Sequence, residues 1–314
     1  MRRSAPSVAS AVGLAAAAWI GTSAGSEPER VLGIKPVYTD RTLTAVPNAA
    51  AMSNRIWSPG LDDGFVPQGL TFLDGFLYVG TYRSEDPKQG RGPCRLYRVD
   101  PRSGAVTGTL DLPVQCGHAG GVARGQAGRL WVADTRAIFE IGIEPQSSGS
   151  TGSVLRSIGL AGHVKGSFAA GTADALWLGT YSKEPGARLY KVPFEKLTGA
   201  RSISEQEATA AVALPTEAQG ATFDAAGRLW ITRSGSGFGE LLTLDPETGA
   251  VLQRVVMPVG VEDISFDPEG GLWVVSEAGS KRWLGWTTLF PLIFRLQPAL
   301  LREIAPRGSK RSRP

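Results

Sequence analysis

The chain has 314 residues with 42% hydrophobic side chains, which is enough to build a sizeable buried core. Its 40 glycines and 21 prolines favour many short strands joined by tight turns and argue against an architecture of long helices. The formal net charge of +4 is concentrated at the two ends of the chain. Because no basic stripe with interleaved aromatic residues is present, a nucleic-acid partner is not expected.

The first residues have the pattern of a secretory signal. Arg2 and Arg3 form a basic start, residues 8–20 form a short apolar stretch, and small residues at 22–24 offer a cleavage site. The apolar stretch is too short and too rich in Ala and Ser for a spanning helix. We therefore predict a signal peptide over residues 1–24, a secreted or periplasmic location and no transmembrane span in the mature chain. A membrane-anchoring N-terminus is the alternative.

Five segments of the chain share one pattern, in which Leu precedes Trp or Tyr soon after a turn that contains Gly. Successive aromatic residues are 53, 46, 53 and 43 positions apart, which is the spacing of β-propeller blades. We interpret these aromatic residues as packing between blades, not as site residues. The pairs are Leu77-Tyr78, Leu130-Trp131, Leu176-Trp177, Leu229-Trp230 and Leu272-Trp273.

Each unit reads as a short inner strand, a strand that carries the Leu-aromatic pair, and a third strand. Two units add a fourth strand after turns at 100–104 and 245–249, where Pro and Gly suit a tight hairpin. The last unit has three strands only, and the segment around Arg55-Ile56-Trp57 reads as an unpaired outer strand. We predict that this segment completes the last blade and so removes open sheet edges.

The sequence therefore predicts an all-β fold, a β-propeller of five blades closed by an N-terminal outer strand, with six blades as the alternative. The predicted organisation is a lead-in over residues 25–54, the propeller over 55–297 and a basic, disordered tail over 298–314. The chain has two cysteines, Cys94 and Cys116. An even count in an exported protein favours a disulfide, and the repeat places both residues at the same end of one hairpin.

Candidate site residues gather at one rim of the predicted channel. Strand direction alternates within a blade, so the starts of the first strands and the ends of the second strands share one face. We predict that the polar residues at these positions bind ligand: Gln68, Tyr82, Asp134, His163, Lys165, Tyr181, Gln219, Arg233 and Asp263. The candidate catalytic residues at the same rim are His118, Glu262 and Glu277.

The two histidines of the chain occupy matching places in adjacent units, each three residues before a glycine. His118 and His163 could act as acid and base near neutral pH. They could also ligate a divalent metal beside Asp134, Glu262 or Glu277, or serve only as hydrogen-bonding loop residues. No short-range ligand motif decides among these, so the cofactor stays open, with a divalent metal as one candidate.

The repeat over about residues 66–283 resembles the secreted bacterial propellers related to the SMP-30/gluconolactonase and NHL-like superfamily. In metal-dependent lactonases of that group, rim carboxylates and Asn hold a divalent cation. Glu262 and Asp263 match the carboxylates in kind, but Asn is almost absent from the repeats of this chain. The first unit, Val66-Pro67-Gln68-Gly69-Leu70 with Leu77-Tyr78, is similar to the opening blade of the five-bladed glutaminyl cyclases. That family places its catalytic Glu directly after Leu-Tyr, where this chain has Val79.

These observations predict an exported propeller that binds a small molecule, glycan or peptide at the top of its central channel. A hydrolase or lactonase, metal-dependent or not, that uses the same rim is the alternative. A scaffold for protein partners is a second alternative. The sequence does not name the ligand or the oligomeric state.

Overall fold

The computed structural model describes residues 30–303. The predicted signal peptide and most of the predicted basic tail lie outside the described residues. The fold below is that of the compact unit that begins at Val31. Within the described range, the strands form five antiparallel sheets that follow one another along the chain, and none of the helices is long and apolar enough to cross a membrane.

The first two blades come directly after the N-terminal segment. The first blade consists of β2 (Phe65–Leu73), β3 (Phe76–Arg83), β4 (Cys94–Val99) and β5 (Val106–Asp111). The second blade consists of β6 (Gly121–Arg124), β7 (Leu130–Asp134), β8 (Ala137–Ile143) and β9 (Gly152–Leu160), to which the short β13 (Ser202–Ile203) is added in parallel.

The next two blades repeat the same four-stranded arrangement. The third blade consists of β10 (Phe168–Gly171), β11 (Ala175–Gly179), β12 (Arg188–Pro193) and β14 (Ala210–Ala213). The fourth blade consists of β15 (Ala218–Phe223), β16 (Leu229–Gly235), β17 (Phe238–Leu244) and β18 (Val251–Val256). The described helices are single turns: η1 (Ala49–Ala51), η2 (Leu61–Asp63), η3 (Gln146–Ser148), α1 (Phe194–Leu197), η4 (Lys281–Trp283) and η5 (Pro298–Leu300).

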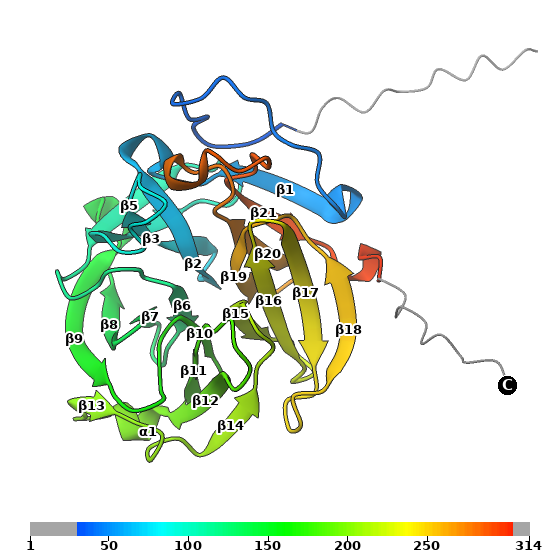
Figure 1. The fold of residues 1–314 in the computed structure, drawn as a ribbon. Coiled ribbons are helices and arrows are strands. Elements are labelled where there is room, and N and C mark those ends of the chain that lie inside the picture. Colours follow the sequence, from blue (N-terminus) through cyan, green and yellow to red (C-terminus); the bar gives the residue numbers. More distant parts are fainter. Residues whose placement is uncertain (1–29, 304–314) are drawn as a thin grey trace, which may run out of the picture. The chain divides into compact units, whose positions relative to one another are not determined.

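The fifth blade joins the two ends of the propeller. Its strands are β19 (Val261–Phe266), β20 (Leu272–Ser276), β21 (Leu292–Leu296) and the N-terminal β1 (Met52–Trp57). β1 pairs with β21 antiparallel, with Ile56 opposite Ile293, and Figure 1 shows the two strands side by side. The predicted closure by an N-terminal outer strand is confirmed, and β1 begins at Met52, within the predicted lead-in.

The inner strands β2, β6, β10, β15 and β19 contact one another in a cycle, which closes the ring around a central axis (Figure 1). The prediction of five blades is therefore confirmed. A closed ring leaves the inner edges of the sheets facing one another, so the loops at one end of the channel come from every blade. This geometry brings residues far apart in the sequence to one place.

The repeated aromatic residues occupy the same register position in every blade. Each is buried and lies opposite the equivalent residue of its inner strand: Tyr78 opposite Thr71, Trp131 opposite Ala123, Trp177 opposite Ala170, Trp230 opposite Thr222 and Trp273 opposite Ser265. Two of them contact the next blade, since Trp177 lies 5.0 Å from the Phe223 ring and Trp230 lies 5.5 Å from the Phe266 ring. The interpretation as packing between blades is confirmed.

Candidate functional site

A cavity of about 580 Å³ opens at the end of the channel where the second strands of the blades finish. A volume of this size suits a small-molecule ligand. All five blades contribute to its lining. The residues include Gln68, His118, Thr135, Ser167, Tyr181, Lys183, Glu217, Gln219, Ser234, Ser236, Glu262, Glu277, Arg282, Trp283 and Trp286.

Six of the twelve residues predicted for this rim line the cavity. They are Gln68, His118, Tyr181, Gln219, Glu262 and Glu277. The structure places the other six behind the cavity wall or away from it. They are Tyr82, Asp134, His163, Lys165, Arg233 and Asp263.

Two buried carboxyl groups of the fifth blade form the centre of the site. Glu262 lies in β19 and Glu277 follows β20 directly, and their residues are 2% and 6% exposed. Burial raises the pKa of both groups, to about 7 for Glu277 and well above the ordinary range for Glu262. A hydrogen bond between the two carboxyls adds to the rise for Glu262 and opposes it for Glu277. The pair therefore keeps a shared proton near neutral pH.

Neighbouring groups hold Glu277 in one orientation. The amide Nε2 of Gln68 donates to Glu277 Oε2 at 2.8 Å and to the carbonyl of Pro67 at 2.9 Å. The Trp283 side chain, the Arg282 charge and the Gln68 amide all lower the pKa of Glu277, but burial outweighs them. Glu262 Oε1 is buried and has no hydrogen-bond partner among residues 30–303. The floor of the cavity thus offers a proton donor, a proton acceptor and one unsatisfied oxygen.

His118 forms the side of the cavity next to the first blade. Its ring stacks on Tyr82 with centroids 4.5 Å apart, and its Nδ1 lies 2.9 Å from the carbonyl oxygen of Gly90. Burial lowers the pKa of His118, so the ring is neutral near pH 7. Arg282, which also lines the cavity, donates to the Tyr82 hydroxyl. Tyr82 therefore supports His118 without lining the cavity itself.

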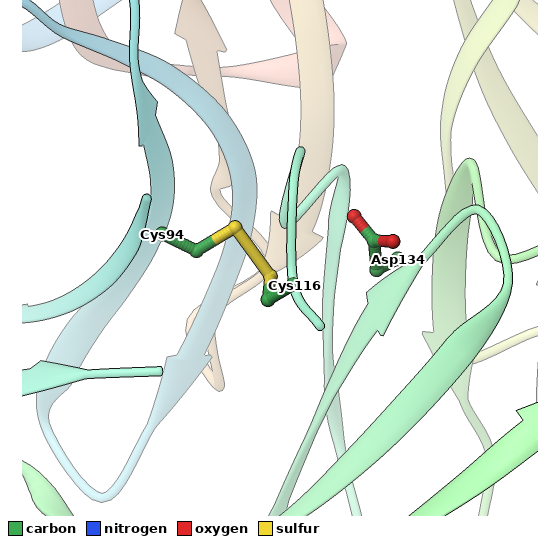
Figure 2. Close-up of side chains that lie close together, drawn as sticks. All are labelled: Cys94, Cys116 and Asp134. Atoms are coloured by element: carbon green, nitrogen blue, oxygen red, sulfur yellow. A yellow bond between two sulfur atoms is a disulfide. The ribbon is translucent and has the colours of Figure 1, made fainter. Parts of the chain in front are cut away.

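Asp134 and the disulfide fix the turn that carries His118. Asp134 Oδ1 accepts the backbone N–H groups of Gly117 at 3.0 Å and His118 at 2.7 Å. Cys94 and Cys116 form the predicted disulfide, with their Cα atoms 5.8 Å apart. Figure 2 shows Asp134 beside this bond, at the end of β7. The turn is held by a covalent link on one side and by a buried carboxylate on the other.

Asp263 does not line the cavity and bonds instead to the inner strands of neighbouring blades. β19 has a register shift between Val261 and Ile264, so the side chains of the adjacent residues Glu262 and Asp263 lie in different surroundings. Asp263 is fully buried, and its Oδ2 accepts the N–H groups of Leu70 at 2.9 Å and Val122 at 3.1 Å. This carboxyl group links the inner strands of three blades, and its oxygens are already occupied by backbone donors, although burial still raises its pKa.

The three remaining predicted residues lie apart from the carboxyl pair. His163 lines a separate cavity of about 420 Å³ with Arg188 and Tyr190. Lys165 Nζ donates to the carbonyl of Gly162, and Arg233 pairs with Glu240 at 3.0 Å. The structure therefore does not bring His118 and His163 together in one cavity.

One wall of the site comes from the loop between β20 and β21, which the sequence analysis did not single out. Arg282, Trp283 and Trp286 in this loop line the cavity. The two indoles stack with centroids 4.7 Å apart, and the Arg282 guanidinium lies 4.1 Å from the Trp283 ring centroid. Two Trp residues outside the blade repeat were the available signal, because they have no packing position in the repeated pattern.

The described residues do not present a donor set that fits a resident divalent metal. A cluster of three side chains with ligand atoms within 4.8 Å of one another occurs at Cys94, Cys116 and Asp134. Its two sulfur atoms are bonded to each other, so they are not thiolate ligands. In the cavity, Glu262 and Glu277 have no third His, Cys or carboxyl ligand atom within 4.8 Å among the described residues, and Asp263 is bonded to backbone N–H groups.

No family model and no curated protein sequence matches the chain. Among solved structures, glutaminyl cyclase from Myxococcus xanthus has a TM-score of 0.50 and 14% identity, over 84% of this chain and 97% of the cyclase. PQQ-bound aldose sugar dehydrogenase from Streptomyces coelicolor has a TM-score of 0.42 and 15% identity, over 67% of this chain and 74% of that chain. Inactive virginiamycin B lyase from Staphylococcus aureus has a TM-score of 0.39 and 15% identity, over 79% and 86%.

These neighbours are propeller enzymes, and at such low identity the likeness to the cyclase concerns the fold alone. The predicted link to the SMP-30/gluconolactonase and NHL-like superfamily stays a prediction, because no family model matches. The functional argument therefore depends on the cavity and its side chains.

Proposed function

We propose that this protein is an acid–base enzyme of the hydrolase type that binds a small molecule, a glycan or the end of a peptide in the channel cavity. The Glu262 and Glu277 pair transfers the proton. The observation that supports this proposal best is the burial of two adjacent carboxyl groups beside an open cavity, with a pKa of about 7 for Glu277.

Such a pair is costly for a fold to keep. Two carboxyl groups in one buried place cannot both ionise easily, and packed apolar side chains would avoid that cost. Environments that move the pKa values of two acids apart assign one as proton donor and the other as base. Here Glu262 is the donor and Glu277 the base, and a base whose pKa lies near 7 works well at neutral pH.

The other lining residues suit binding and orientation of a polar substrate. Gln68 holds Glu277 by a 2.8 Å hydrogen bond, so the base has a defined direction. Gln219, Ser234 and Tyr181 offer neutral donors and acceptors on the opposite wall. The unsatisfied Oε1 of Glu262 is available to a donor group of the substrate. Cleavage of a polar bond by water fits this arrangement without further groups.

The proposal is tested with a panel of esters, lactones, glycosides and short peptides, assayed between pH 5 and 9. For the substrate that turns over, kcat/KM should rise with pH through about 7, as Glu277 becomes ionised, and fall where Glu262 loses its proton. Glu277→Gln should lower kcat by about 100-fold or more, because it removes the base and keeps the shape.

The matched control is Glu247→Gln, which alters an exposed carboxyl in the turn between β17 and β18. This variant should retain full activity. Activity that survives in both Glu262→Gln and Glu277→Gln would contradict the proposal. If ligands raise the melting temperature of the protein but none of them is turned over, the protein is a binding propeller and the enzyme proposal is rejected.

We also propose that the protein acts outside the cytoplasm, since a disulfide persists in an oxidising compartment. Cell fractionation with an antibody would test this. Recovery of the protein in the cytoplasm with free thiols would contradict it.

A further inference from the structure

The segment that precedes β1 contacts the loop between β20 and β21, two strands of the blade that β1 completes. Tyr38 Oη donates to the carbonyl of Gly279 at 2.5 Å. Arg41 donates from Nη1 to the carbonyl of Leu284 at 2.8 Å and from Nη2 to that of Thr287 at 2.6 Å. These contacts join residues about 240 positions apart.

Thr44 adds a third attachment between the same two segments. Its backbone N–H donates to the carbonyl of Leu289 at 3.0 Å, and its Oγ1 accepts the backbone N–H of Leu289 at 2.9 Å. The loop is thus held at Gly279, near its middle and close to its end. A loop of this length that lacked such bonds would sample many conformations.

Each attachment point is next to a residue of the cavity. Gly279, which has a φ of 90° that suits glycine, comes two residues after Glu277. Leu284 follows Trp283 directly, and Thr287 follows Trp286 directly. The contacts are therefore placed where they set the position of the base and of the aromatic wall, although neither Tyr38 nor Arg41 lines the cavity.

The attaching segment is itself fixed to the propeller. Asp62 Oδ1 accepts the backbone N–H groups of Val37 at 2.8 Å and Tyr38 at 3.2 Å. Burial and the Asp62 charge raise the pKa of Tyr38, so its hydroxyl remains a donor throughout the neutral and mildly alkaline range. Further along the chain, Thr44 leads into η1 and β1. The loop is therefore fastened to a rigid support.

We propose that Tyr38 and Arg41 are positioning residues, which clamp the loop between β20 and β21 and thereby hold Glu277 and Trp283 in the cavity. This inference rests on the proposed function of the cavity, but its structural part can be tested without a substrate. Removal of the clamp lets the loop move outward and lets water reach Glu277. Since burial is the main cause of the raised pKa of Glu277, water should lower it.

The experiment follows the titration of Glu277 by NMR in protein labelled with ¹³C at the Glu carboxyls. The signal is assigned by its loss in Glu277→Gln. Tyr38→Phe removes one hydroxyl and keeps the packing, and Arg41→Ala removes both of the other donors. In the double variant, the titration midpoint of Glu277 should fall by about one pH unit or more from its value near 7. Tyr38→Phe alone should give a smaller fall in the same direction.

The matched control is Asn48→Gly. It removes a hydrogen bond of the same kind, from Asn48 Nδ2 to the carbonyl of Val256 at 2.8 Å, which lies on β18 and not on the loop. Asn48 has a φ of 56°, so glycine replaces it without backbone strain. The Glu277 midpoint should stay unchanged in this control. The clamp is disproved if the midpoint is also unchanged in folded Tyr38→Phe and in the folded double variant.

The two proposals fail in different ways. If the Glu277 midpoint falls in the clamp variants but the wild type turns over no substrate, the clamp proposal is supported and the enzyme proposal is rejected. If turnover depends on Glu277, but Tyr38→Phe and Arg41→Ala change neither the turnover nor the Glu277 midpoint, the enzyme proposal is supported and the clamp proposal is rejected. If both proposals hold, the double variant should lower kcat more than it raises KM, since the loop carries the base.

Discussion

The hairpin of β19 and β20 carries buried carboxyl groups at both of its ends. The pKa is lowered at one end and raised at the other. At the closed end, Asp267 accepts hydrogen bonds from Arg295 Nε at 2.5 Å, from Trp273 Nε1 at 2.9 Å and from the Gly271 N–H at 2.8 Å. Burial opposes the ionised form, but these donors outweigh it and lower the pKa of Asp267.

At the channel end, burial is the largest cause that raises the pKa values of Glu262 and Glu277, and the Glu277 charge raises that of Glu262 further. Asp267 and Glu277 are both 6% exposed, but Glu277 lies deeper among protein atoms, so burial opposes its ionised form more strongly. The supply of donors adds to this difference, because cations and N–H groups stabilise the ionised form of a buried carboxyl group. In this blade, the ionised Asp267 contributes to stability, whereas Glu262 and Glu277 lie beside an open cavity in surroundings that disfavour their ionised forms.

The largest effect is expected from breaking the satisfied end. Asp267→Ala leaves the Arg295 guanidinium and the Trp273 indole N–H without their acceptor, and it should lower the free energy of unfolding by about 3–5 kcal/mol. Urea denaturation at pH 7 measures this change. Asp224→Ala is the matched control in the fourth blade, where the same contact to Trp230 is paired with a more exposed Arg228, so about 1–2 kcal/mol is expected. Equal losses would show that the charge at Asp267 has no special weight.

The next effect concerns the covalent support of the channel end. Cys94→Ala with Cys116→Ala opens a loop with a sequence separation of 22 and should lower the free energy of unfolding by about 3 kcal/mol. It should also loosen the turn of His118, whereas the Asp267 end should keep its structure. Hydrogen exchange of the backbone amides at residues 117–121 and 267–271 separates the two ends. Uniform loss of protection at both would contradict a local role.

Substitution of Glu277 at the channel end should raise the free energy of unfolding at neutral pH, whereas the two changes above lower it. The pKa of Glu277 is raised in the folded protein, so the stability of the wild type should fall as pH rises from about 4.5 through about 7. Glu277→Gln cannot ionise and should not show this fall. Between pH 4 and pH 8, the stability of the variant relative to wild type should grow by on the order of 3 kcal/mol. Urea denaturation at both pH values measures this growth, and a constant difference would show that Glu277 is not strained.

The smallest effect is expected from an exposed ion pair at the channel end. Lys281 Nζ lies 3.0 Å from Glu85 Oε1, and the Glu85 side chain is 55% exposed. Because such pairs are screened by water, Lys281→Ala should change the free energy of unfolding by less than about 0.5 kcal/mol. A loss as large as that of Asp267→Ala would mean that charges at this end matter for stability, and the contrast between the ends would fail.

Part of the site could be read from the chain because the repeat places it. Gln68, Gln219 and Glu262 occupy equivalent places in their inner strands, Glu277 follows a second strand, and a closed ring brings both kinds of position to one rim. Tyr82 and Asp134 stand at similar positions but lie behind the lining. The direction of a side chain at a strand end depends on bulges and turns, as at the register shift of β19, and the alternation of residues does not predict these.

Five blades, with six as the alternative, the closing strand and the disulfide were predicted from the sequence, and the structure confirms five blades, the strand and the disulfide. Each depends on a periodic pattern or on a small number of pairing choices, which are local or nearly local properties of the chain. The different surroundings of two adjacent residues became visible only in the folded structure, where Asp263 accepts backbone N–H groups of neighbouring blades and Glu262 lines the cavity. The contacts of Tyr38 and Arg41 with the loop that carries Trp283 were likewise not predictable from the sequence. These roles arise from contacts between distant segments, and the burial and hydrogen-bond partners that give a carboxyl its pKa exist only once the ring has closed.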